Sequence, residues 1–91
     1  LLKTGVSIKY WRTQGGAEVD FVVEKDNSLI PIEVKLSVSE LRVEKSLRSF
    51  IHKYKPAKAI VVFYTGVEGS LKIDGCNVVF IGVDKLQAAL K

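Results

Sequence analysis

The chain has 91 residues, of which 47% are hydrophobic and 26% are charged, and its formal net charge is +4. These values fit one small globular domain and exclude a disordered chain as well as a second domain. No apolar run approaches the roughly 18 residues that a membrane-spanning helix requires, so a cytoplasmic protein without a membrane segment is expected. The sequence contains no methionine, which predicts that residues 1–91 are a fragment of a longer protein.

Three strands joined by tight turns are predicted in the first part of the chain. Residues 6–12 and 17–24 are rich in β-branched and aromatic types, alternate in polarity, and are separated by the turn signal TQGG. The cluster KDNS at 25–28 marks a second turn, and the strand LIPIEVKL follows it at 29–36. The three strands are therefore expected to form an antiparallel meander.

A helix is predicted next, because Ser37 and Glu40 match the capping-box pattern S-x-x-E. It is expected to begin at about Val38 and to end before Pro56. Helical spacing predicts its buried side, which consists of Val43, Leu47, Phe50, Ile51 and Tyr54.

The last third of the chain predicts further strands of the same sheet. The run AIVVFY at 59–64 is continuously apolar, which is typical of a strand buried on both faces and reached by a strand-helix-strand crossover. A short strand at 71–73 and a last strand at 78–81 follow, and Asp84 with Gln87 indicates a terminal helix. The predicted fold class is α/β, a sandwich around a mixed sheet.

The third predicted strand carries charges where burial is expected. Side chains alternate across a strand, so one face carries Glu33 and Lys35 while the other is apolar. The apolar face, expected in the core, consists of Ile30, Ile32, Val34 and Leu36. Charges inside a sheet are costly unless they are paired or bound to a metal. A hairpin closed around residues 25–28 places Asp20 opposite Glu33.

Asp20 and Glu33 are the candidate metal ligands. Two adjacent carboxylates repel each other unless a cation lies between them, and oxygen ligands favour Mg²⁺ or Mn²⁺. The backbone carbonyl of Val34 is a further candidate ligand, and Lys35 is a candidate for orienting water or stabilising charge on a phosphate. Asp20, Glu33 and Lys35 are thus the candidate catalytic residues. The alternative is a buried ion-pair cluster that binds no metal.

Asp20, twelve intervening residues and the motif Glu33-x-Lys35 resemble the PD-(D/E)XK nuclease superfamily. More narrowly, YWRTQGGAEVDFVVE and LIPIEVKLS are similar to the C-terminal domain of unknown function in prokaryotic AAA-type ATPases. The resemblance covers most of the chain. It implies a restriction-endonuclease-like three-layer sandwich in which the matching Asp and Glu bind metal and the matching Lys assists the attacking water.

The resemblance also implies that this domain is the C-terminal part of an ATPase whose nucleotide site lies upstream, because no G-x-x-x-x-G-K-[ST] occurs here. The superfamily usually has a helix before the meander, often with a further metal-binding acid, and we expect this chain to lack it. Glu18 is the candidate substitute, or else a solvated edge residue. The alternative function is a catalytically inactive module of the same fold that binds DNA or protein.

A basic cluster between positions 42 and 58 is the candidate nucleic-acid surface, since part of it recurs at helical spacing. The candidates for phosphate contact are Arg12, Arg42, Lys45, Arg48 and Lys55. A solvated helix face is the alternative for the helical members, and neutralisation of Glu18 or Asp20 is the alternative for Arg12.

Overall fold

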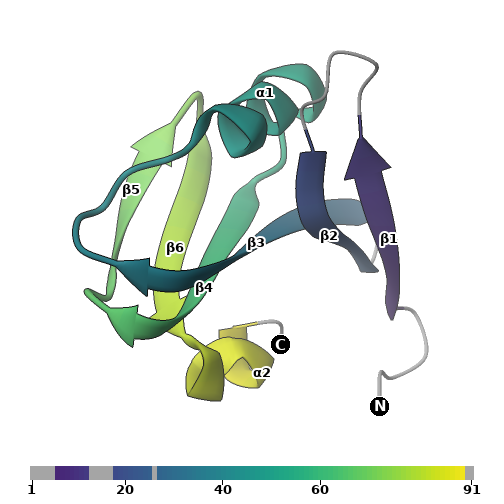
Figure 1. Cartoon of the computed structure of the whole chain (residues 1–91). Coiled ribbons are helices and arrows are strands. Elements are labelled where there is room, and N and C mark those ends of the chain that lie inside the picture. The colour runs from purple at the N-terminus through teal and green to yellow at the C-terminus, as the bar shows by residue number, and fades with distance from the viewer. Residues whose placement is uncertain (1–5, 13–17, 26, 90–91) are drawn as a thin grey trace.

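The computed structural model describes the backbone of residues 6–12, 18–25 and 27–89, and the side chains of residues 19–25 and 27–89. The elements run in the order strand, strand, strand, helix, strand, strand, strand, helix (Figure 1). Their bounds are β1 Val6–Arg12, β2 Glu18–Lys25, β3 Ser28–Val38, α1 Lys45–Tyr54, β4 Lys58–Gly66, β5 Gly69–Ile73, β6 Cys76–Gly82, the 3₁₀ turn η1 Val83–Lys85, and α2 Leu86–Ala89.

The strands form one six-stranded mixed sheet in the order β1-β2-β3-β4-β6-β5. The β1–β2 and β2–β3 pairs are antiparallel, β4 is parallel to both β3 and β6, and β5 returns antiparallel along β6. The predicted α/β class, the meander and the strand-helix-strand crossover are confirmed. The predicted turn at TQGG lies outside the described residues.

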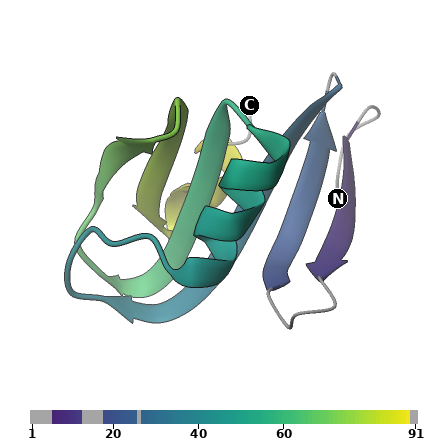
Figure 2. The same cartoon turned by 90° about the horizontal axis from the view of Figure 1, so that it is seen from above.

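β4 is the centre of the sheet, and both of its faces are covered. Ala59 to Phe63 are between 0% and 3% exposed. One face packs against Leu47, Phe50 and Ile51 of α1, and the other packs against Leu86 and Ala89 of α2. Figure 2 shows α1 in front of the sheet and α2 behind it. No helix in the described part of the chain is long and apolar enough to cross a membrane.

The predicted start of the main helix is wrong. β3 continues to Val38, where its parallel ladder with β4 ends at the pair Val38 and Gly66, and α1 begins only at Lys45. Ladder hydrogen bonds to a buried neighbouring strand therefore outweigh the local capping signal of Ser37 and Glu40. The predicted end is confirmed, because α1 stops at Tyr54 and Lys55 adopts a left-handed conformation with φ 52° before Pro56.

The apolar face predicted for β3 is only half buried. Ile32 is 4% exposed, whereas Val34 is 43% exposed and Leu36 is 78% exposed. The short α2 packs with the cluster around Ile32 and Ile60, and the described residues provide no cover for the far end of β3. Burial along a strand therefore depends on how far the covering helix reaches.

A bulge in β2 changes the faces expected for that strand. Lys9 pairs with Val22 and Trp11 pairs with Val19, so β2 uses one residue more than β1 over this step. Val19 and Val22 consequently both join the core on the α1 side, although strict alternation predicts opposite faces. The extra residue lies in the Asp20–Phe21 segment, where it redirects the candidate ligand.

Candidate functional site

The ladders that β3 forms with its two neighbouring strands overlap only at Ile32. Residues 28–32 of β3 pair with β2, and residues 32–38 pair with β4. Where β3 continues past Ile32, β2 no longer runs beside it and the two strands diverge, as Figure 1 shows. At Glu33 and Lys35 the β2-facing edge of β3 therefore borders an opening, while the opposite edge stays paired with β4.

Asp20 closes the end of the ladder between β2 and β3 with its side chain. The Val34 backbone N–H donates a hydrogen bond to Asp20 Oδ2, at 2.8 Å. The register predicted from the KDNS turn is confirmed, since Lys25 pairs with Ser28 and Phe21 with Ile32. The next pair in that register is Asp20 with Glu33, but here the bulged strand offers a carboxylate in place of its backbone.

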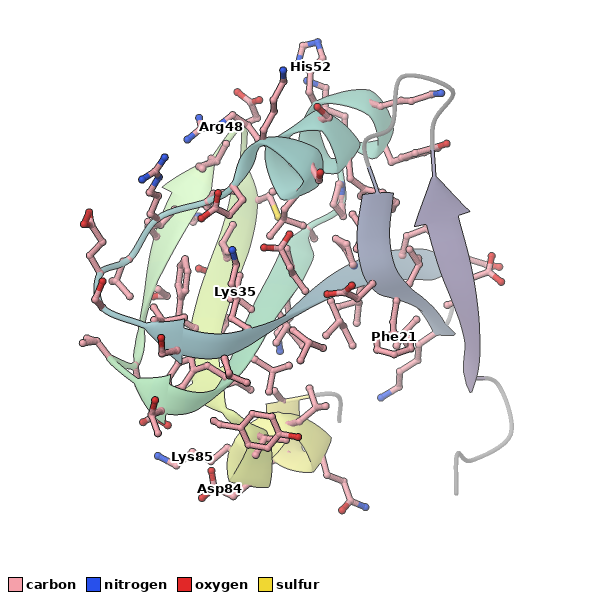
Figure 3. The ribbon with its side chains drawn as sticks, viewed as in Figure 1. Phe21, Lys35, Arg48, His52, Asp84 and Lys85 are labelled. Carbon is pink, nitrogen blue, oxygen red and sulfur yellow. The ribbon has the colours of Figure 1, made fainter. Side chains whose placement is uncertain are left out.

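A cleft of about 370 Å³ opens at this point, between the diverging strands and the start of α1. It is lined by Asp20, Glu33, Val34, Lys35, Glu44, Lys45 and Ser46, and we call it the β2–β3 cleft. The structure thus brings together all four residues that the sequence predicts for catalysis and metal binding. Figure 3 shows Lys35 rising from β3 into the space below α1.

Glu33 is the buried acid of the cleft, with only 9% of its surface exposed. Its burial raises the pKa of the carboxyl group above the usual value, although the nearby Lys35 ammonium opposes this shift. The negative charges of Asp20 and Glu44 raise the pKa further. The carboxylate form of Glu33 is therefore held at a cost that a bound cation would relieve.

Lys35 lies between two carboxylates. Its Nζ is 3.5 Å from Glu33 Oε2 and 3.2 Å from Glu44 Oε2. Burial by itself lowers the pKa of the ammonium group, but the hydrogen bond to Glu44 and the charges of Glu33 and Glu44 outweigh it, and the net shift is upward. Lys35 is thus held as a cation, which suits charge stabilisation and does not suit proton abstraction.

Glu44 is a cleft residue that the sequence prediction missed. In the sequence it is a lone acid among basic residues. The predicted helix began at about Val38, which placed Glu44 inside the helix rather than at its N-cap. Its side chain is half-exposed and reaches across to β3. A sequence signal existed in the position of Glu44 just before the apolar spacing of Leu47, Phe50 and Ile51, because the helix dipole favours an acid near the N-terminus of a helix.

Within residues 19–25 and 27–89, no group of three or more His, Cys, Asp or Glu side chains is arranged to hold a metal ion. The carboxylate donors that the structure offers at the predicted metal position are Asp20 and Glu33. The side chain of Glu18, the predicted substitute ligand, lies outside the described residues.

The candidate phosphate-binding residues spread along α1 and its approach. Arg42, Lys45, Arg48 and Lys55 are all exposed. Lys45 lines the β2–β3 cleft and also a second hollow of about 400 Å³, which it shares with Arg48, Ser49, His52, Ile73 and Asp74. Lys55 is ten residues along the chain from Lys45, about 15 Å at the rise of an α-helix. The side chain of Arg12 lies outside the described residues.

Comparison with known proteins identifies a family. The family model described as Domain of unknown function (DUF4143) matches residues 1–83. No curated protein and no solved structure matches the chain.

Proposed function

This chain belongs to the family described as Domain of unknown function (DUF4143), and we propose that it is a metal-dependent nuclease-type domain that acts on nucleic-acid phosphodiesters. The observation that carries the proposal is the β2–β3 cleft, in which Asp20, Glu33 and Lys35 meet around open space. The resemblance to the PD-(D/E)XK superfamily supports the same function. It also supports a restriction-endonuclease-like topology and attachment to an AAA-type ATPase.

The donor chemistry of the cleft fits a divalent cation. Asp20 and Glu33 supply carboxylate oxygens, and the repulsion between their charges contributes to the raised pKa of Glu33. Oxygen donors of this kind favour Mg²⁺ or Mn²⁺. Asp20 and Glu33 would hold the cation with the carbonyl of Val34, and the cation would supply Lewis-acid activation of water and phosphate.

The protein's own groups define the remaining roles. Lys35, held as a cation by its acidic neighbours, stabilises negative charge that develops on a phosphate in the cleft. The amide of Val34 fixes one oxygen of Asp20 and so orients that carboxylate. Lys45, at the rim of the same cleft, is placed to attract the phosphate backbone.

The test is a calorimetric titration of the protein with Mn²⁺, repeated on Glu33→Gln, followed by a nuclease assay on both. Saturable binding that is lost in the variant is expected, since the amide of Gln is a weaker ligand than a carboxylate. Cleavage should also be lost in Glu33→Gln while nucleic-acid affinity is retained. Glu40→Gln, on the exposed loop before α1, is the matched control. Equal cleavage by the wild type and Glu33→Gln contradicts the assignment of Glu33.

A catalytically inactive module is the second candidate, favoured by the ion pairs of Lys35 with Glu33 and Glu44. A cluster that neutralises its own charges needs no metal to persist. In that case Mn²⁺ does not bind, and the basic residues of α1 hold DNA or a protein partner. The titration separates the two candidates, because only the nuclease requires the metal.

A further inference from the structure

The residue at the N-cap of α1 does not cap its helix. Glu44 has the extended backbone of an N-cap, with φ −73° and ψ 165°, yet its side chain makes no hydrogen bond to the first turn. A side-chain oxygen at the N-cap usually stabilises a helix by accepting a hydrogen bond from the amides of the first turn. The carboxylate of Glu44 forgoes this contact and lies 3.2 Å from the Lys35 ammonium on β3 instead.

This arrangement sets where the ammonium lies. Lys35 Nζ is closer to Glu44 than to Glu33, at 3.2 Å and 3.5 Å. Among the described side chains these two carboxylates are the ion-pair partners that Lys35 has. If Glu44 were removed, the full attraction of the ammonium would fall on Glu33, which is the more buried of the two acids.

Glu44 is not arranged as a third metal ligand. The described residues contain no metal-holding group of three acidic, His or Cys side chains, although Asp20, Glu33 and Glu44 line one cleft. The contact that Glu44 makes is with the neighbouring cation. A role through Lys35 is therefore better supported than direct coordination.

We propose that Glu44 is a positioning residue that holds the Lys35 ammonium on the α1 side of the β2–β3 cleft and so leaves Glu33 able to take a divalent cation. The effect on metal binding rests on the proposed function, whereas the position of Lys35 rests on the ion-pair geometry alone. This role explains why an acid whose carboxylate does not cap the helix stands at the N-cap. Glu44 then draws the Lys35 ammonium toward itself, so that the charge of Glu33 stays available for a metal ion.

The first test needs no metal. Crystal structures of the wild type and Glu44→Ala, both metal-free, should show Lys35 Nζ moving closer to Glu33 Oε2 than the 3.5 Å of the intact pair. Glu40→Ala, on the same loop, removes an equal charge and should leave Lys35 in place. An ammonium that keeps its position in Glu44→Ala, or moves away from Glu33, overturns the proposal.

The second test is a double-mutant cycle on Mn²⁺ affinity with Glu44→Ala, Lys35→Ala and the double variant. Glu44→Ala should weaken binding about threefold or more when Lys35 is present and change it little when Lys35 is absent. Equal weakening in both backgrounds would mean that Glu44 acts only as a negative charge, which overturns the proposal. If the wild type binds no Mn²⁺, the proposed metal-dependent function fails, and the position of Lys35 in the metal-free structures still decides the role of Glu44.

Discussion

At the scale of single residues, the buried charge of Glu33 shows a conflict between stability and chemistry. The side chain is almost fully covered, and its pKa is raised chiefly by burial. A carboxyl group whose pKa is raised in the folded state binds more protons there than in the unfolded state. Its contribution to stability therefore falls as the pH rises from the unfolded pKa, near 4.5, through the folded one.

Glu33→Gln is expected to be more stable than the wild type at neutral pH, because Gln fills the same space without the cost of a buried charge. Lys35 keeps Glu44 as a partner in this variant. The gain should shrink as the pH is lowered toward 4.5 and below, where the wild-type carboxyl group becomes protonated in both states. Urea unfolding of both proteins at several pH values measures this, and a constant difference would show that burial does not govern Glu33.

A second residue-scale prediction concerns the end of the β3–β4 ladder. Gly66 and Gly75 both have positive φ, but a Cβ on Gly66 would lie 2.4 Å from the backbone oxygen of Val38, whereas a Cβ on Gly75 would have nothing within 4 Å. Gly75→Ala should therefore cost only backbone strain, about 1 kcal/mol, and Gly66→Ala should cost at least about 2 kcal/mol. Thermal unfolding compares the two, and equal losses would contradict the clash at Val38.

At the scale of elements, the site depends on how β2 and β3 part. The bulge in β2 places Asp20 so that its carboxylate accepts a hydrogen bond from the Val34 amide. The β2–β3 ladder ends at Ile32, so the β2-facing edge of β3 is unpaired at Glu33 and Lys35, while the other edge stays paired with β4. The start of α1 then supplies Glu44 from the N-cap and Lys45 from the first helical position. The lining of the cleft therefore comes from β2, β3 and the start of α1 together.

Helix α1 also provides a prediction about capping. Glu44→Ser supplies a hydroxyl that can accept from the first-turn amides, which Glu44→Ala cannot do. Both variants lose the half-exposed ion pair with Lys35, so their difference isolates the cap. Glu44→Ser should be more stable than Glu44→Ala by about 0.5–1 kcal/mol, measured by urea unfolding. If the alanine variant is equally stable, the start of α1 does not lie at Lys45.

At the scale of the whole molecule, part of the positive charge of the described residues lies beside the cleft and continues along α1. Lys45 lines the cleft, and Arg42 lines a neighbouring hollow that shares Lys35 and Glu44 with it. Arg48 continues the basic surface along α1 toward the turn between β5 and β6. Figure 3 shows Arg48 and His52 projecting from the upper part of the molecule, on the α1 side. A polyanion held there would pass over the opening that holds Asp20 and Glu33.

Replacing Lys45 and Arg48 together with Ala is expected to weaken DNA binding and to flatten its dependence on salt. Each phosphate contact contributes about 0.7 to 0.9 to the slope of log affinity against log salt, so the loss of two contacts should reduce the slope by about 1.5. Fluorescence anisotropy at several salt concentrations measures the slope. Lys72→Ala with Lys85→Ala, on exposed residues outside the basic cluster, is a control of equal charge. An unchanged slope in the Lys45 and Arg48 variant would remove α1 from the binding surface.

Much of this protein follows from local sequence alone. Alternation, the KDNS turn and the apolar run at 59–64 predict the meander, its register and the buried central strand, because these features depend on neighbouring residues and on polarity. The same register brings Asp20 toward Glu33, so the candidate site is predictable to that extent.

Tertiary structure decided the rest. The start of α1 moved from about Val38 to Lys45 because the ladder with β4 extends β3, and no local capping signal reports the length of a partner strand. The exposure of Val34 and Leu36 depends on the short reach of α2, and the placement of Asp20 depends on a bulge against β1. The pairing of Glu44 with Lys35 joins residues from two elements. Such contacts are set by how elements pack, which the order of residues in any one segment does not contain.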